Sequence, residues 1–101
     1  MYRHALQLSV IVGFRHKGLK RLFEKGDAGG IRPDLLDKVR TILVQLDEAV
    51  TIDDMRLTSF HLHALKGDRK GFWAVTVRAN WRIIFRLNDG EADDVELIDY
   101  H

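Results

Sequence analysis

The histidines are the residues best suited to acid/base chemistry. Five are present, at His4, His16, His61, His63 and His101. His61 and His63 would share one face of a strand, because alternate residues point the same way. A metal site would need a third and fourth ligand at fixed geometry, and the spacing supplies none, so we expect no metal and no cofactor. Two interpretations stay open for the imidazoles: half-buried surface residues, or proton exchange near neutral pH.

The arginines alternate with apolar residues between positions 72 and 87, FWAVTVRANWRIIFRL. One alternating set is apolar: Trp73, Val75, Val77, Trp81, Ile83, Phe85 and Leu87. The other set carries Thr76, Arg82 and Arg86. This pattern predicts two half-buried strands, with both tryptophans in the core. The guanidinium groups on the second face either bind an anion or pair with the acidic segment 93–99.

The length of the hairpin loop decides whether apolar residues of one strand pair with apolar residues of the other. A three-residue loop at positions 78–80 pairs Val77 with Trp81 and Val75 with Ile83, and sets Thr76 opposite Arg82. We expect Asn80 to adopt the left-handed backbone that the loop needs at its last position.

Charge is nearly balanced overall and unevenly distributed. The net charge is +1, yet positions 15–25 hold five Lys or Arg against Glu24 alone, and positions 89–99 hold six acids and no base. An anionic partner suits the basic segment. The chain has no cysteine, so it can have neither disulfides nor thiolate metal sites. No apolar run approaches the roughly 20 residues of a membrane span, and no small-residue cleavage pattern follows residues 6–14. We therefore expect a cytoplasmic protein.

Hydrophobic periodicity predicts the order of elements. A strand is predicted at 8–14, a short helix at 17–25, and a second helix from Pro33 to about Asp47. Thr51 or Asp53 would cap one helical turn at 54–57. Strands follow at 62–66, in the hairpin and at 95–100, with a charged turn at 67–71 and a tight turn at 88–90. The fold class is therefore α+β, in the order β-α-α-β-β-β-β, with helices packed on a twisted, mainly antiparallel sheet.

Three segments together resemble a known family. They are GFRHKGLKRLFEKG at 13–26, HLHALKGDRKGFWAVTVRANWRIIF at 61–85, and the last three residues, DYH. They are similar to HigB-type toxins of the RelE/ParE-like toxin–antitoxin superfamily, also called the plasmid maintenance killer protein family. The resemblance covers residues 10–101 and implies a single domain with the RelE-like fold. The first ten residues depart from the family pattern, which makes residues 1–9 a candidate N-terminal extension.

The resemblance implies a metal-independent endoribonuclease that cuts mRNA on the ribosome and so arrests translation and growth. The catalytic residues that it implies are His63, Lys66, Arg82, Asp99, Tyr100 and His101. Arg82 would bind the scissile phosphate, with Lys66 as a second cation. His63 and His101 would exchange the protons, in either order, with Asp99 orienting an imidazole or acting as the base. Tyr100 would stack on a base or hold the backbone.

Partners follow from the same resemblance. We expect a helix-turn-helix antitoxin of the HigA type, with oligomers arising mainly through it. mRNA on the ribosome and ribosomal RNA are the other expected partners, and no membrane is involved. The residues expected to bind RNA are Arg15, Lys17, Lys20, Arg21 and Arg78; for the basic helix, a merely solvated face is the alternative. Two other functions stay open: a ParE-like gyrase inhibitor, and a catalytically inactive interaction module.

Overall fold

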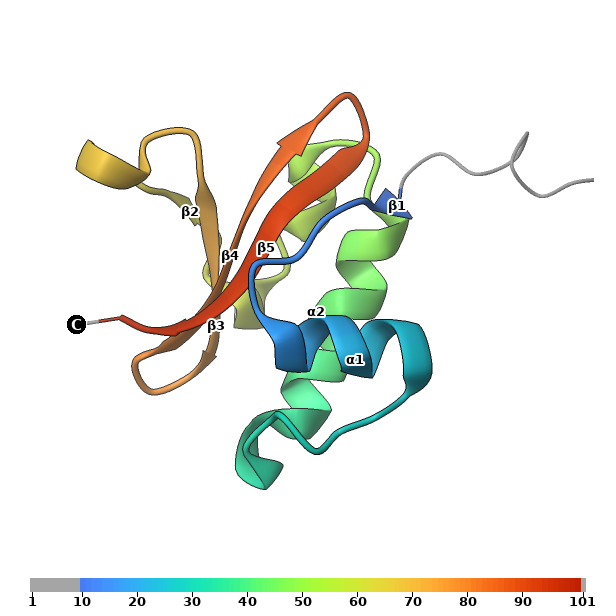
Figure 1. Ribbon diagram of the computed structural model, residues 1–101. Coiled ribbons are helices and arrows are strands. Elements are labelled where there is room, and N and C mark those ends of the chain that lie inside the picture. Colours follow the sequence, from blue (N-terminus) through green and yellow to red (C-terminus); the bar gives the residue numbers. More distant parts are fainter. Residues whose placement is uncertain (1–9, 101) are drawn as a thin grey trace, which may run out of the picture.

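The computed structural model describes residues 10–100 of the chain. The elements follow one another as β1 (Val10–Ile11), α1 (Lys17–Lys25), α2 (Leu36–Glu48), β2 (His63–Ala64), β3 (Trp73–Arg78), β4 (Trp81–Asn88) and β5 (Glu91–Asp99) (Figure 1). This order confirms the predicted α+β class. Within the described range, no helix has the length and apolar character needed to cross a membrane. The predicted N-terminal extension at 1–9 lies outside the described residues.

Helix α1 has the bounds predicted from the sequence, and both of its ends are capped. At the start, Nδ1 of His16 accepts a hydrogen bond from the Leu19 amide at 3.1 Å. Burial lowers the pKa of His16 from its ordinary value of 6.5, the carboxylate of Glu96 raises it by less, and Arg21 lowers it further. At the end, Gly26 adopts a left-handed backbone with φ of 72°, a conformation that costs glycine nothing.

The second predicted helix is a short 3₁₀ turn, η2 (Pro33–Leu35), followed by α2. A further 3₁₀ turn, η3 (Ile52–Met55), begins two residues earlier than the predicted turn at 54–57. Thr51 caps it, as predicted, in a reciprocal capping box with Asp54. The carboxylate of Asp54 accepts the amides of Val50 and Thr51, and these two bonds lower its pKa. Another 3₁₀ turn, η4 (Thr58–Phe60), precedes β2.

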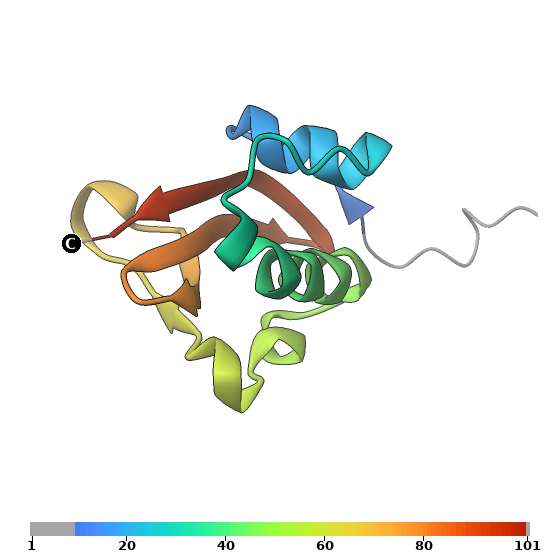
Figure 2. The ribbon, with the colours of Figure 1, turned by 90° about the horizontal axis from the view of Figure 1, so that it is seen from below.

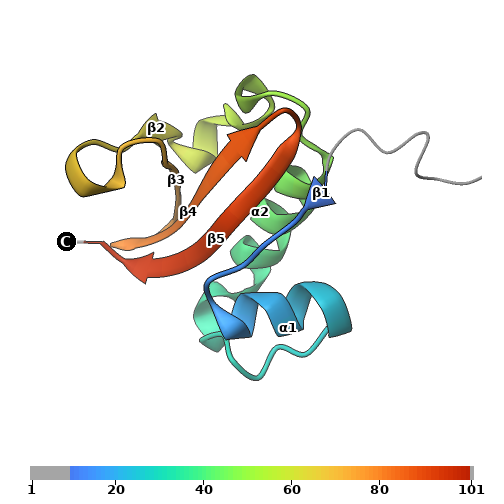
Figure 3. The same cartoon turned by 45° about the horizontal axis from the view of Figure 1, so that its top comes forward.

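The five strands form one sheet in the order β1-β5-β4-β3-β2. The pairs β2–β3, β3–β4 and β4–β5 are antiparallel, and β1 runs parallel to β5 at one edge. Figure 3 shows β1 beside β5 and β2 at the opposite edge. The last strand in the sequence therefore lies inside the sheet, between the first strand and β4.

The β3–β4 hairpin confirms the predicted register in part. Val75 pairs with Ile83 and Thr76 with Arg82, as expected. The three-residue loop is wrong, because Arg78 pairs with Trp81 and the extra residue forms a bulge in β3 between Thr76 and Arg78. The bulge absorbs the residue that the prediction had placed in the loop. The left-handed residue is consequently Ala79, with φ of 51°, and not Asn80.

Three other strand predictions have the right place and the wrong length. β2 covers two residues of the predicted 62–66, and Gly67–Arg69 of the charged turn forms a 3₁₀ turn, η5. β5 begins at Glu91, four residues before the prediction, because its first residues continue the ladder with β4 after the tight turn at Asp89 and Gly90. β1 has two described residues of the predicted 8–14, of which positions 8 and 9 lie outside the described range.

Alternation divides the sheet into two faces, as predicted. The inner face carries Val75, Val77, Ile83 and Phe85, which join Leu97 and the buried stripe of α2 in the main core. That stripe consists of Val39, Ile42, Leu43 and Leu46. Leu19 and Leu22 of α1 belong to the same core, and Figure 2 shows α1 and α2 against the strands (Figure 2). Both tryptophans pack against this core, half-buried, which confirms their predicted place.

Candidate functional site

The candidate site lies on the outer face, the side of the sheet turned away from α2. A second, smaller apolar cluster forms its floor: Leu65, Phe72, Ala74 and Ile84, with Ile98 packed against them. The register gives the rows of this face. His63 pairs with Ala74, which pairs with Ile84. In the neighbouring row, Arg82 lies between Thr76 and Ile98. Residues predicted from distant parts of the sequence thus share one surface.

His63 is exposed at the edge of this face. Its Nδ1 lies 3.1 Å from the carbonyl oxygen of His61. A carbonyl oxygen only accepts hydrogen bonds, so Nδ1 is the donor in this contact, which leaves Nε2 for other partners. Two strand spacings and two residues separate the Cα atoms of His63 and Arg82, which places them about 12 Å apart. The two long side chains can therefore approach one ligand from either side.

Arg82 is held by the backbone of its own turn. Its Nη1 donates to the carbonyl oxygens of Ala79 at 2.6 Å and Trp81 at 3.1 Å. Its Nε is buried without a hydrogen-bond partner. In the described part of the chain, Arg82 forms no ion pair, whereas Arg86 lies 3.5 Å from Asp94. The predicted pairing with the acidic segment is thus seen for Arg86, and among the described residues no ion pair is seen for Arg82.

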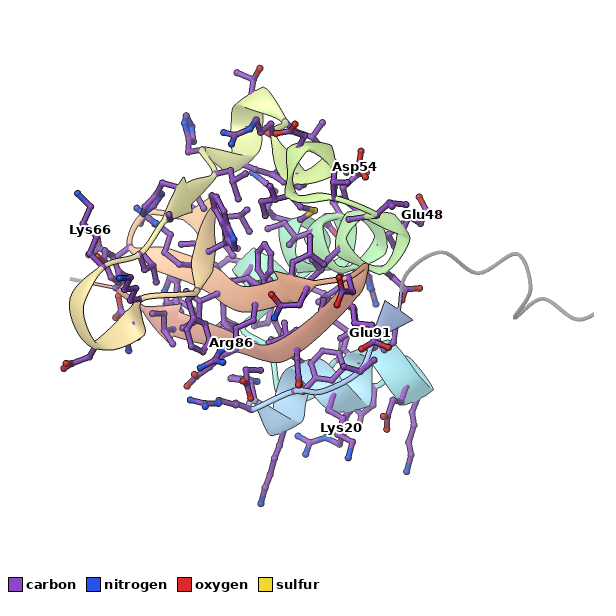
Figure 4. The ribbon with its side chains drawn as sticks, turned by 90° about the horizontal axis from the view of Figure 1, so that it is seen from above. Lys20, Glu48, Asp54, Lys66, Arg86 and Glu91 are labelled. Atoms are coloured by element: carbon purple, nitrogen blue, oxygen red, sulfur yellow. The ribbon has the colours of Figure 1, made fainter. Side chains whose placement is uncertain are left out.

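Lys66 and Tyr100 come together although 34 positions separate them. Both line a pocket of about 230 Å³, together with Leu65, Asp68 and Arg69. The backbone fixes Tyr100 next to the hairpin, because its amide donates to the carbonyl of Asn80 at 2.7 Å. Lys66 extends outward at the start of turn η5 (Figure 4), and no carboxylate within residues 10–100 pairs with it. A phosphate could therefore meet this ammonium group directly.

The two remaining predicted catalytic residues are placed less favourably or not described. Asp99 pairs with Trp81 in the β4–β5 ladder, whereas Arg82 pairs with Ile98. Strand alternation thus sets Asp99 with the inner-face residues, one position away from the row of Arg82. His101 lies outside the described residues. The register sets His63 and Arg82 on the outer face, and Lys66 and Tyr100 line a pocket whose walls include neither of those two residues.

All three arginines expected to bind RNA have acidic partners. Arg15 lies 3.2 Å from Asp94, Arg21 3.6 Å from Asp27, and Arg78 3.8 Å from Asp34. The pKa of Asp34 is lowered mainly by the hydrogen bonds from Arg32. Lys17 and Lys20 have no ion pair within the described range, and Lys20 points away from the sheet (Figure 4). Within the described range, the exposed cations of α1 without an ion pair are Lys17, Lys20 and Lys25.

Sequence reasoning missed Asp68 and Arg69 as candidates. Both line the pocket of Lys66 and Tyr100. Residues 67–71 were predicted only as a charged turn. The signal that could have indicated a functional role was the high charge of this turn between two strands of one sheet. Among the residues that the structure describes, no group of three or more His, Asp or Glu side chains is arranged to hold a metal ion.

Two comparisons extend these observations. Residues 12–101 match the family described as the RelE-like toxin of type II toxin–antitoxin system HigB. "Endoribonuclease HigB" of Proteus vulgaris is 45% identical over 92 residues, which cover 91% of this chain and 100% of that protein.

Solved structures show a similar fold at low sequence identity. The crystal structure of a YafQ mutant from E. coli has a TM-score of 0.55 and 18% identity, covering 87% of this chain and 88% of that one. YafQ from E. coli strain BL21(DE3) has a TM-score of 0.51 with the same identity and coverage. At this identity the likeness supports the fold alone, while the match over residues 12–101 supports the family. The chain belongs to the HigB family of RelE-like toxins of type II toxin–antitoxin systems.

Proposed function

We propose that this toxin is an endoribonuclease that cleaves mRNA on the ribosome by acid/base catalysis without a metal. The observation that carries the proposal is the convergence of Lys66 and Tyr100 in one pocket, on the side of the sheet where Arg82 has no acidic partner among the described residues. The endoribonuclease name of the relative from Proteus vulgaris, over nearly the whole chain, supports the reaction class.

The chemistry requires two proton transfers and stabilisation of one charged phosphorus centre. The 2′-hydroxyl loses a proton and its oxygen bonds to phosphorus, while the bond from phosphorus to the 5′-oxygen breaks and that oxygen gains a proton. The free Nε2 of His63 can take the first proton, with His101 giving the second, or the two exchange roles. Arg82 and Lys66 stabilise the developing negative charge on the phosphate oxygens.

Arg82 suits this role because its orientation is fixed before RNA binds. Two backbone carbonyls hold Nη1, so the guanidinium does not need to reorganise when charge develops. Tyr100 presents its ring at the pocket, 37% exposed, where it can stack on a nucleobase. Asp99 keeps the two roles considered for it, the orientation of an imidazole or the base itself, although strand alternation sets it one position away from the row of Arg82.

The partners follow from the type II family, whose toxins act with an antitoxin. We propose a helix-turn-helix antitoxin of the HigA type, through which oligomers form, in the cytoplasm. Ribosomal RNA would contact the exposed lysines of α1, Lys17 and Lys20.

Induced expression in cells tests the proposal. New transcript 5′ ends should accumulate within translated messages, and should disappear from a reporter whose start codon is removed. A gyrase supercoiling assay of the purified toxin is the control for the ParE-like alternative. Growth arrest without new 5′ ends, or cleavage that ignores translation, would contradict the proposal.

A further inference from the structure

A cluster of two arginines and one aspartate lies on the outer face beyond the candidate site. The guanidinium carbons of Arg86 and Arg15 lie 4.9 Å and 5.6 Å from the ring centroid of Phe72. Both distances are within cation–π range. Phe72 is only 6% exposed and belongs to the apolar floor of the outer face, so both charged groups rest on a fixed support.

The carboxylate of Asp94 contacts the Nε atom of both arginines. Nε of Arg15 lies 3.2 Å from Oδ1 of Asp94, and Nε of Arg86 lies 3.5 Å from Oδ2. In the described residues, the terminal Nη nitrogens of both arginines have no hydrogen bond. The side chains of Arg15 and Arg86 are 54% and 47% exposed. Two positive charges thus share one negative charge, and their free donors face solvent in the fork geometry that matches phosphate oxygens.

The position of the cluster relates it to the proposed nuclease site. Arg86 is four residues from Arg82 on the same strand and face, about 13 Å along β4. The amide of Leu65, a residue of the Lys66 pocket, donates to the carbonyl of Phe72 at 2.9 Å. Figure 4 shows Arg86 on the side of β4 and β5 opposite α2. An RNA strand held at Arg82 can therefore continue to Arg86 without leaving this face.

Two further carboxylates, Glu96 and Asp93, lie near the cluster on neighbouring positions of β5. Glu96 lies in the row between the two positions, opposite Ile84. Its field acts on His16 at the start of α1, where it raises the pKa of that imidazole against the larger effect of burial. Asp93 lies opposite Arg86 in the β4–β5 register, and its Oδ1 accepts a hydrogen bond from the Asp94 amide, while the Asp94 carboxylate is engaged by both arginines.

We propose that Arg15 and Arg86, resting on Phe72 and oriented by Asp94, form a second phosphate-binding position for the RNA strand, separate from the reacting phosphate. This inference rests on the proposed nuclease function for its substrate class. It assigns these two arginines to strand binding and leaves the chemistry to the site described above.

The test measures equilibrium binding of a short, uncleavable 2′-O-methyl oligoribonucleotide to the purified toxin at several salt concentrations. Each phosphate contact on a single strand contributes about 0.7 to the slope of log K against log salt. Arg86→Gln should reduce the slope by about 0.7, so that its affinity relative to wild type changes about 2.6-fold between 50 and 200 mM salt. Asp94→Asn, which removes the shared negative charge, should bind more tightly than wild type.

Matched variants separate binding from folding. Arg56→Gln is the control, because Arg56 also pairs with an aspartate, Asp53 at 2.8 Å, and lies at the end of turn η3 away from this face. It should keep the wild-type slope. Arg86→Lys keeps the charge and loses the fork, so it should also keep the slope. If Arg86→Gln binds with wild-type affinity and slope while losing thermal stability, the cluster is structural and the proposal is wrong.

The same series distinguishes this inference from the nuclease proposal. A toxin that cuts translated messages in cells, with Arg86→Gln binding unchanged, refutes the second phosphate position alone. A toxin that makes no cuts and still shows the predicted slopes refutes the nuclease function and leaves the binding position standing.

Discussion

Replacing Arg82 by alanine should separate catalysis from folding more clearly than any other single change. The proposed mechanism assigns Arg82 to the scissile phosphate, and Arg82 has no ion pair in the described residues that would compete for its charge. Removing one preorganised donor of this kind typically slows the chemical step about 10²- to 10³-fold, equivalent to about 3–4 kcal/mol. The proposal therefore predicts a loss of this size in cleavage.

The cost to folding should be smaller. The substitution removes the two hydrogen bonds from Nη1 to Ala79 and Trp81, each worth about 0.5–1.5 kcal/mol. It also removes the buried, unpartnered Nε, which offsets part of that loss. A net loss of about 1–2 kcal/mol corresponds to a fall in Tm of roughly 4–16 °C for a domain of this size. The variant should remain folded at growth temperature.

The assay is single-turnover cleavage of a defined message on programmed ribosomes, with thermal denaturation of the same preparations. Arg82→Lys is the matched variant, because it keeps one positive charge and loses the fork. It should recover part of the rate, since a single ammonium group cannot both hold the turn carbonyls and contact two phosphate oxygens. Wild-type cleavage by folded Arg82→Ala would refute the assignment of the phosphate to this residue.

Four further predictions concern other parts of the molecule. The free energy of unfolding should decrease as the pH falls below about 6.5. The pKa of His16 is lower in the folded protein than in the unfolded chain, so on acidification the unfolded chain takes up this proton first. The stabilisation present above pH 6.5 is therefore lost as the pH falls through the folded-state pKa. The loss should not exceed the contribution of one N-cap, about 0.5–2 kcal/mol, because His16 caps α1. It can be measured as the difference between the urea unfolding midpoints at pH 7 and pH 5. The difference should disappear in His16→Asn, because asparagine caps the helix and does not titrate. Gly18→Ala should destabilise by about 1–3 kcal/mol despite the better helix propensity of alanine, because its Cβ would lie 2.6 Å from the carbonyl oxygen of Gly30; a gain in Tm would contradict this. Tyr100→Phe should cleave at near the wild-type rate and Tyr100→Ala far more slowly if the ring stacks on a base, and equal losses in both would implicate the hydroxyl instead. Cleavage on ribosomes should persist when a chelator is present at a concentration that leaves the ribosome intact, and restoration only by added zinc or manganese would contradict the proposed mechanism.

Hydrophobic periodicity predicted the fold because most of its helices and strands bury only one of their faces. The alternation from Trp73 to Leu87 assigned these residues to the inner face, and the three- and four-residue spacing in α2 gave its buried stripe. The predicted length of the hairpin loop was wrong, and the residue types could not have shown this. A bulge within β3 and an extra residue in the loop give the same pairing of Val75 with Ile83, so the pattern could not distinguish them.

The candidate site was predicted only in part for a related reason. The resemblance named the residues, and the sheet order then brought Lys66 to Tyr100 across strands that are not neighbours in sequence. Asp68 and Arg69 were missed because a charged turn carries no periodic signal of where it folds back. The sharing of Asp94 by Arg15 and Arg86 depends on a left-handed residue at position 94, with φ of 51°, which no local sequence rule predicts for aspartate in a strand.

The place of β5 in the sheet has a consequence for the toxin during its own synthesis. The residues from 91 onward are translated after the rest of the described sheet, and within the described chain they supply the only strand that pairs with β1 and three buried side chains of the main core, Ala92, Val95 and Leu97. A nascent chain halted before codon 91 thus holds its first strand without a neighbour and its two helices over an incomplete core. We therefore expect a chain that lacks residues 91–100 to fail to fold into the toxin domain, because its core would be incomplete.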